Sequence, residues 1–228
     1  LKKYNIPGPR YTSYPTVPYW ETSPSESEWL NSISQSINVN QKNNIGASLY
    51  IHIPFCKTLC TYCGCNTRIT QNTSHFDPYI DTILKEWEMY QNRLKLDKKI
   101  AISEIHLGGG TPTYLEANHL KRLLTSILKT VSLADSFEFS LEGHPNTTTE
   151  EQLKTLYDLG FKRLSLGVQD FDPVVQDIVN RIQPVEVVKK VTEQARKIGF
   201  TSINYDLIYG LPLQKEKSII NTIKDVKE

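Results

Sequence analysis

The chain has no marked excess of either charge, no long hydrophobic run and only four cysteines in 228 residues. With 26 Lys and Arg against 25 Asp and Glu, the formal net charge is +1, so no basic field exists to attract nucleic acid. No apolar run approaches the roughly 20 residues that span a bilayer. The opening LKKYNIPGPRYTSYP contains no hydrophobic signal-peptide core. We therefore expect a cytoplasmic protein that binds neither nucleic acid nor membrane.

All four cysteines lie in the stretch PFCKTLCTYCGC, residues 54–65. A disulfide framework is disfavoured, because disulfides are rare in a reducing compartment and small secreted proteins scatter their cysteines. A structural zinc site usually takes two separated ligand pairs, and no second pair follows here, although zinc stays an alternative. Cys56, Cys60 and Cys63 would supply three thiolates on one short loop. Three thiolates leave one iron of a four-iron cluster open to chemistry.

Residues 1–46 are predicted to form an N-terminal arm with one helix. PGPRYTSYPTVPYW has four prolines in fourteen residues, which excludes an ordinary helix or a central strand. The following SPSESEWLNSISQSI has Ser25 and Glu28 placed as a capping box. The apolar side chains of one helical face, which we expect to lie against a neighbour, are Trp29, Leu30, Ile33 and Ile37.

From residue 47 to residue 228, short β-prone runs alternate with amphipathic helical segments. A helix is expected to open at Asp77 and Pro78, and Gly160 and Gly199 stand where helices should end. Such alternation indicates parallel strands with right-handed crossovers, an α/β fold. The predicted strands are residues 47–53, 103–107, 137–142, 162–169 and 202–210.

Polar residues follow or end these strands at corresponding places. They are Cys56, residues 108–111, Glu142, Gln169 and Asp206. In a parallel β/α barrel the carboxyl ends of the strands face one site, so these groups should meet in one cavity. The chain stops after a sixth helix, short of the roughly 250 residues of an eight-unit barrel. We therefore expect a partial, open parallel β/α barrel.

Five motifs in order carry a family resemblance: RYTSYP (10–15), LYIHIPFCKTLCTYCGC (49–65), IHLGGGTPTYL (105–115), LSLGVQDF (164–171) and DLIYGLP (206–212). Together they resemble the oxygen-independent coproporphyrinogen III oxidases, or dehydrogenases, of the radical S-adenosylmethionine (SAM) superfamily. The resemblance covers essentially the whole chain. GGGT at 108–111 lacks the Lys and the spacing of a nucleotide phosphate loop, but its glycines allow close approach of a ligand to the backbone.

The resemblance implies a 4Fe-4S cluster bound by Cys56, Cys60 and Cys63, with SAM chelating the fourth iron. Cys65 matches a cysteine that is not a ligand of the cluster, and His52 is given no role. The positions that match the first SAM site are Tyr50, Gly109 and Glu142. The resemblance also implies a second SAM molecule, and the positions that match its site are Tyr62, Gly110, Thr111, Gln169, Arg181 and Asp206.

The implied activity is the anaerobic oxidative decarboxylation of coproporphyrinogen III to protoporphyrinogen IX in heme biosynthesis, through a 5′-deoxyadenosyl radical. An electron donor such as a flavodoxin-like protein and a monomeric state are expected, and no catalytic side chain is identified. The family continues through a sixth strand and a C-terminal domain, so the chain is expected to be truncated. A local departure is Gly143 and His144, where the family commonly has a larger residue and an aspartate.

Two alternatives remain. The related heme-chaperone branch shares the cysteine loop, but it typically lacks RYTSYP and has a bulky residue at the position of Cys65. A non-catalytic zinc-binding module would make the polar residues at the strand ends incidental. Iron with acid-labile sulfide favours the enzyme, and zinc without sulfide favours the module.

Overall fold

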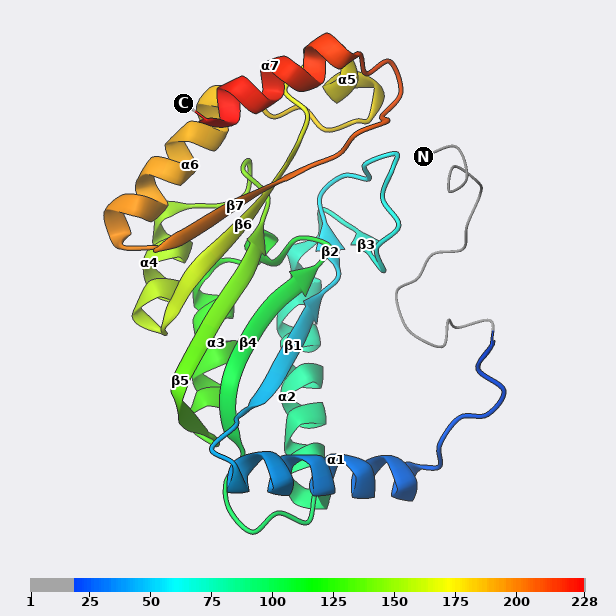
Figure 1. Cartoon of the computed structure of the whole chain (residues 1–228), viewed down its shortest axis with the longest axis vertical. Coiled ribbons are helices and arrows are strands. Elements are labelled where there is room, and N and C mark those ends of the chain that lie inside the picture. The colour runs from blue at the N-terminus through cyan, green and yellow to red at the C-terminus, as the bar shows by residue number, and fades with distance from the viewer. Residues whose placement is uncertain (1–18, 228) are drawn as a thin grey trace.

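Five parallel strands form one open sheet in the order β1-β4-β5-β6-β7 (Figure 1). The computed structural model describes residues 19–227, so the RYTSYP motif lies outside the described residues. The strands are β1 (Ala47–Ile53), β4 (Ala101–Gly109), β5 (Ser132–Gly143), β6 (Phe161–Gln169) and β7 (Ser202–Leu207), with a small pair β2 (Phe55–Cys56) and β3 (Arg68–Ile69). The helices are α1 (Glu26–Lys42), α2 (Phe76–Arg93), α3 (Ala117–Leu128), α4 (Glu150–Asp158), α5 (Pro173–Ile178), α6 (Val185–Ile198) and α7 (Glu216–Lys227), with 3-10 turns at Thr73–His75 and Pro112–Tyr114.

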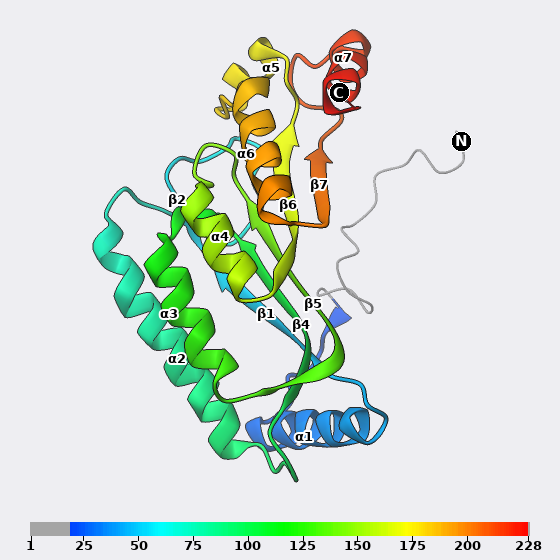
Figure 2. The same cartoon turned by 90° about the vertical axis from the view of Figure 1, so that its left-hand side faces the viewer.

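Helices α2, α3, α4 and α6 cover one face of the sheet (Figure 2). The apolar residues that alternate along the strands point into this layer: on β6, Leu164, Leu166 and Val168 are buried. Leu120, Leu123, Leu124 and Ile127 of α3 are buried in the same core. The prediction of an α/β fold with parallel strands is confirmed.

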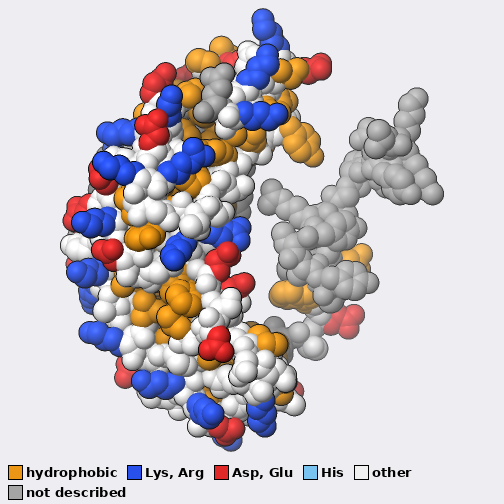
Figure 3. All heavy atoms as spheres, turned by 60° about the vertical axis from the view of Figure 1, so that its left-hand side comes forward, with side chains coloured by type: hydrophobic (Ala, Val, Ile, Leu, Met, Phe, Trp, Pro, Cys, Tyr) orange, Lys and Arg blue, Asp and Glu red, His pale blue; other side chains and the backbone are white. Residues whose placement is uncertain are grey.

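The other face of the sheet is polar and lines the hollow side of the molecule (Figure 3). The side chains that alternate with the core residues on this face are Ser48, Tyr50, His52, Glu104, His106, Glu138, Ser140, Glu142, Arg163, Ser165, Asn204 and Asp206. A cavity of about 410 Å³ runs along those on β4, β5, β6 and β7. Because successive side chains of a strand point to opposite faces, this alternation gives the sheet one apolar and one polar face.

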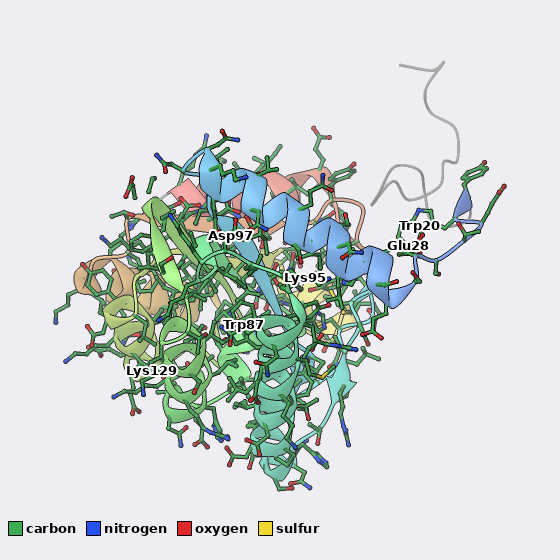
Figure 4. The ribbon with its side chains drawn as sticks, turned by 90° about the horizontal axis from the view of Figure 1, so that it is seen from below. Trp20, Glu28, Trp87, Lys95, Asp97 and Lys129 are labelled. Carbon is green, nitrogen blue, oxygen red and sulfur yellow. The ribbon has the colours of Figure 1, made fainter. Side chains whose placement is uncertain are left out.

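Helix α1 begins with the predicted capping box, in which Ser25 and Glu28 exchange hydrogen bonds. It crosses the lower end of the helical layer near Trp87 and Lys95 (Figure 4). Asn38 Nδ2 donates to the Lys95 carbonyl at 3.1 Å, and Trp29 Nε1 donates to Tyr90 Oη at 3.3 Å. The predicted apolar face is only partly buried, because Trp29 remains 49% exposed.

Several boundaries differ from the sequence-based prediction. The strand predicted over 202–210 ends at Leu207, because Ile208 turns to donate its N–H to the Gln169 carbonyl and Gly210 adopts φ +80°. The second strand is longer than predicted and runs through Gly109, which pairs with Ile53. Two-residue β2 and β3 are too short to leave a pattern in the sequence.

The predicted helix-ending glycines, Gly160 and Gly199, do adopt positive φ, at +99° and +120°. The helix that was predicted to open at Asp77 and Pro78 is α2, which begins one residue earlier, at Phe76. None of the helices between residues 19 and 227 combines the length and apolar character needed to cross a bilayer.

Candidate functional site

A pocket of about 490 Å³ lies at the carboxyl ends of the strands and is lined by eleven of the twelve predicted site residues. These eleven are Cys56, Cys60, Tyr62, Cys63, Gly109, Gly110, Thr111, Glu142, Gln169, Arg181 and Asp206. Tyr50 is the exception, because it lies on β1 outside the lining of the pocket. Parallel strands place their carboxyl ends at one edge, which is why residues so distant in sequence converge.

Backbone hydrogen bonds fix both ends of the cysteine loop. Cys56 lies on β2, and its carbonyl accepts from Thr70 N at 2.9 Å. Cys63 N donates to the Cys60 carbonyl at 3.0 Å, which closes a tight turn. Asn180 Nδ2 donates to the Leu59 carbonyl at 2.8 Å. The loop is therefore held by its own small sheet on one side and by the segment after α5 on the other.

The glycine loop packs directly beneath the first cysteine. A Cβ on Gly110 would lie 2.6 Å from the Pro54 carbonyl oxygen and 2.8 Å from Cys56 Sγ. Gly109 has φ +124°, and a Cβ there would lie 2.7 Å from the Ile53 carbonyl oxygen. Thr111 Oγ1 is 3.2 Å from Cys56 Sγ. Only residues without side chains allow the two loops to approach this closely.

Glu142 points its carboxylate at the glycine loop. Gly109 N donates to Oε2 at 3.3 Å, and His106 Nε2 lies 3.4 Å from Oε1. Tyr50 stacks on His106 and bonds to His52 Nδ1 at 3.0 Å. Burial, with the nearby charge of Glu142, raises the pKa of Tyr50. Tyr50 is thus joined to the site through His106 rather than by lining the pocket.

Arg181 enters the pocket from the segment after α5. Its Nη2 donates to the Gly167 carbonyl at 2.7 Å and its Nε to Gln183 Oε1 at 3.1 Å. Gln169, at the end of β6, adopts φ +66°, a strained conformation that is common at functional sites. Asp206 accepts from Ser165 Oγ and Asn204 Nδ2, both at 2.8 Å.

Sequence reasoning gave no role to His144, which also lines the pocket. Asn146 N donates to its Nδ1 at 3.2 Å, so the proton of the neutral ring is on Nε2. Burial, with the charge of Arg181, lowers the pKa of His144 to about 3. The only sign of this residue in the sequence was the departure of LEGHP from the family pattern.

The donor set fits an iron–sulfur cluster. All four cysteines are free, and Cys56, Cys60 and Cys63 line one pocket. Burial raises the pKa of the Cys56 thiol, which the Thr111 hydroxyl and Arg181 partly oppose. Within residues 19–227, no three His, Cys, Asp or Glu side chains converge as ligands of a single metal ion. Cluster thiolates each bind a separate iron, so they need to face a common space rather than a common point.

The family model of the radical SAM superfamily matches residues 50–226. The chain belongs to the radical SAM superfamily. This confirms the superfamily predicted from the motifs. Among curated relatives, this radical SAM chain is similar to the oxygen-independent coproporphyrinogen III oxidase of Salmonella typhimurium, at 40% identity over 228 residues, covering 100% of this chain and 48% of that protein. The corresponding protein of Pseudomonas aeruginosa is 37% identical, covering 99% of this chain and 48% of the relative.

Among solved structures, the coproporphyrinogen III oxidase HemN from Escherichia coli, described as a radical SAM enzyme, matches with TM-score 0.83 and 38% identity over 95% of this chain and 48% of that one. The radical SAM methyltransferase TsrM from Kitasatospora setae, at TM-score 0.54 and 13% identity, covering 83% of this chain and 35% of that one, shares the fold alone. The predicted radical SAM fold is confirmed. This radical SAM chain spans about half the length of the curated relatives it matches.

Proposed function

We propose that this chain is the SAM-binding part of an oxygen-independent coproporphyrinogen III oxidase, which converts coproporphyrinogen III to protoporphyrinogen IX in heme biosynthesis. The observation that carries the proposal is the convergence of three cysteines, the glycine loop and strand-end carboxylates in one pocket. The names of the relatives and of the HemN structure support the substrate class.

Cys56, Cys60 and Cys63 hold a 4Fe-4S cluster and leave one iron open. When bound, the cluster supplies the electron that cleaves SAM reductively into methionine and a 5′-deoxyadenosyl radical. The chain's own residues hold the cofactor in place. The carboxylate of Glu142 accepts hydrogen bonds from the ammonium or ribose of a first SAM, and Gly109 allows its close approach, with Tyr50 beside them.

A second SAM molecule is proposed at the far side of the same pocket. Its site combines the cation of Arg181, the acceptor Asp206 and the amide of Gln169 with three residues of the two loops, Tyr62, Gly110 and Thr111. Arg181 offers a guanidinium to a carboxylate, and Asp206 offers an acceptor to an ammonium. A cation and an anion in the same pocket suit the two charged groups of an amino-acid zwitterion.

The substrate would enter over the rim of the pocket, where Leu59 and Ile182 are 51% and 56% exposed. Apolar rim residues suit the pyrrole rings of a porphyrinogen, and holding a propionate carbon against the reacting group lowers the entropic barrier. We further propose a cytoplasmic monomer that receives electrons from a flavodoxin-like protein. A reducing compartment keeps the cysteines available as ligands.

Electron paramagnetic resonance of the anaerobically reconstituted and reduced protein, recorded with and without SAM, tests this proposal. A 4Fe-4S signal that changes when SAM is added is the expected result. A cluster signal indifferent to SAM would overturn the SAM site, and zinc without acid-labile sulfide would return the chain to the zinc-module alternative. With SAM bound, conversion of coproporphyrinogen III separates this function from the heme chaperone, which would retain heme without decarboxylating the substrate.

A further inference from the structure

Three residues on the polar face of the sheet form a row across three neighbouring strands. Tyr50 on β1 is in register with His106 on β4, and His106 is in register with Ser140 on β5. The rings of Tyr50 and His106 stack, with centroids 5.8 Å apart and planes 20° apart. Ser140 Oγ lies 2.7 Å from His106 Nδ1. The imidazole is therefore fixed on one side by stacking and on the other by a short hydrogen bond.

The remaining nitrogen of this imidazole faces Glu142, two residues beyond Ser140 on the same strand. His106 Nε2 lies 3.4 Å from Oε1. A carboxylate oxygen can only accept, so Nε2 carries a proton, and in the neutral ring Nδ1 accepts from the Ser140 hydroxyl. The order of donation is thus from Ser140 to His106 to Glu142. The last contact, at 3.4 Å, is longer than the bond from Ser140 at 2.7 Å.

The Glu142 side chain is 48% exposed, and its hydrogen-bond partners among the described residues are His106 and Gly109. Without these partners an exposed glutamate would populate several rotamers, and a ligand would have to order it on binding. The Gly109 N–H holds Oε2 from the glycine loop, and His106 holds Oε1 from below. The rotamer is therefore selected before the ligand arrives.

We propose that His106 is a positioning residue that, oriented by Ser140 and Tyr50, pre-orders the Glu142 carboxylate for SAM. This inference rests on the proposed function, since it takes SAM as the ligand of Glu142. In this arrangement His106 does not touch the cofactor. The row of Tyr50, His106 and Ser140 across the three strands contributes to SAM binding only through Glu142. The position of Tyr50 outside the pocket follows from the same arrangement, because its ring supports the imidazole.

The test is a double-mutant cycle on SAM affinity, measured by equilibrium dialysis with the reconstituted protein. His106→Leu removes the donor, His106→Gln keeps one, and Glu142→Gln removes the carboxylate. We expect His106→Leu to weaken SAM binding about tenfold or more, and His106→Gln to restore most of it. In the Glu142→Gln background, His106→Leu should have little further effect, because there is no longer a carboxylate to position.

His75→Leu is the matched control, since His75 bonds to Arg68 away from the pocket. Its SAM affinity should equal that of the wild type, and iron content and melting temperature should stay the same in all variants. Ser140→Ala should weaken SAM binding less than His106→Leu does. Two results would overturn this inference and leave the proposed function standing, provided that the wild type binds SAM. One is that His106→Leu binds SAM as well as the wild type does; the other is that its effect adds in full to that of Glu142→Gln. If the wild type binds no SAM, the inference and the proposed function both fail.

Discussion

The guanidinium Nη1 of Arg181 lies 3.6 Å from Sγ of Cys60, although 121 residues separate the two in the chain. The contact joins the cysteine loop to the segment after α5, which is also tied to it by the Asn180 side chain. A fixed cation thus lies beside a proposed ligand of the cluster and at the proposed second SAM site.

Arg181→Met should leave the cluster intact but reduce turnover at least tenfold, because Met keeps the aliphatic bulk and loses the donors to a carboxylate. The cost in the free energy of unfolding should be about 2 kcal/mol, since the Gly167 carbonyl still accepts from Gln183 Nε2 at 3.0 Å but the buried Gln183 Oε1 loses its donor. Iron content, turnover and urea denaturation measure the three effects. Loss of iron in this variant would show instead that Arg181 supports the cysteine loop.

Cys60→Ala should abolish assembly of the 4Fe-4S cluster, because two thiolates do not hold a cluster that needs three. Cys65→Ser is the matched control, as Cys65 lies in the same loop region and lines the same pocket. It should retain full iron and sulfide content. Iron and acid-labile sulfide are measured after anaerobic reconstitution. Full iron in Cys60→Ala would contradict the assignment of the ligands.

Gly110→Ala should reduce cluster content by more than half, because its Cβ would lie 2.6 Å from the Pro54 carbonyl and 2.8 Å from Cys56 Sγ. The Pro54 carbonyl belongs to the backbone and cannot rotate away, so the cysteine loop has to move. Gly210→Ala is the control, because a Cβ at this position has no atom within 4 Å. Its backbone has φ +80°, so the substitution introduces backbone strain without a steric clash. It should cost about 1 kcal/mol of stability and leave iron content unchanged. Equal iron content in the two variants would rule out the steric argument.

His144 should make stability depend on pH. Its pKa is lowered from 6.5 to about 3 by burial and by Arg181. Below pH 6.5 the unfolded chain takes up a proton that the folded chain does not, so the free energy of unfolding falls as the pH decreases from 6.5 toward 3. Above pH 6.5 the contribution of His144 to stability is fully present. The loss should reach about 2 kcal/mol at pH 5. His144→Gln cannot titrate and should lack this component in urea denaturation at pH 5 and pH 8; an unchanged difference between the two pH values would contradict the assignment.

Asp170 should be critical for stability, because its side chain is buried and fully hydrogen-bonded. It is 2% exposed and accepts from Thr222 Oγ1 at 2.9 Å, from Gln214 Nε2 at 2.6 Å and from Asp172 N at 2.7 Å. Asp170→Asn replaces one acceptor with a donor and should cost about 3 kcal/mol. Thr222→Val removes one donor to Asp170 and the acceptor of the Phe171 N–H, and should cost about 2 kcal/mol, less than Asp170→Asn. On thermal unfolding, similar losses for both variants would show that the carboxylate is not the centre of this network.

The regular elements could be predicted because their patterns are local. The apolar run of residues 47–53 matches β1 residue for residue, and Gly160 and Gly199 adopt positive φ where helices were predicted to end. The capping box at Ser25 also lies within a few residues of sequence. In each case the signal is the period of a strand, the period of a helix or the chemistry of a helix end.

The strand ends and the small elements could not be predicted in this way. Gly108 and Gly109 belong to β4 because Ile53 and His52 pair with them, and this pairing is not visible in the glycines themselves. The end of β7 at Leu207 depends on a hydrogen bond from Ile208 to Gln169, 39 residues earlier. Pairing between distant segments decides such boundaries.

The sequence by itself determined the α/β fold, the three-cysteine loop, the glycine loop and the family, because these depend on residue type and spacing along the chain. Only the tertiary structure decided that Arg181 meets Cys60, that Tyr50 reaches the site through His106, and that His144 is a half-buried imidazole on the pocket wall whose Nδ1 accepts from Asn146 N. The physical reason is that hydrogen bonding and burial depend on which atoms lie within a few ångströms. The packing of parallel strands at a common edge brings those atoms together from positions more than a hundred residues apart.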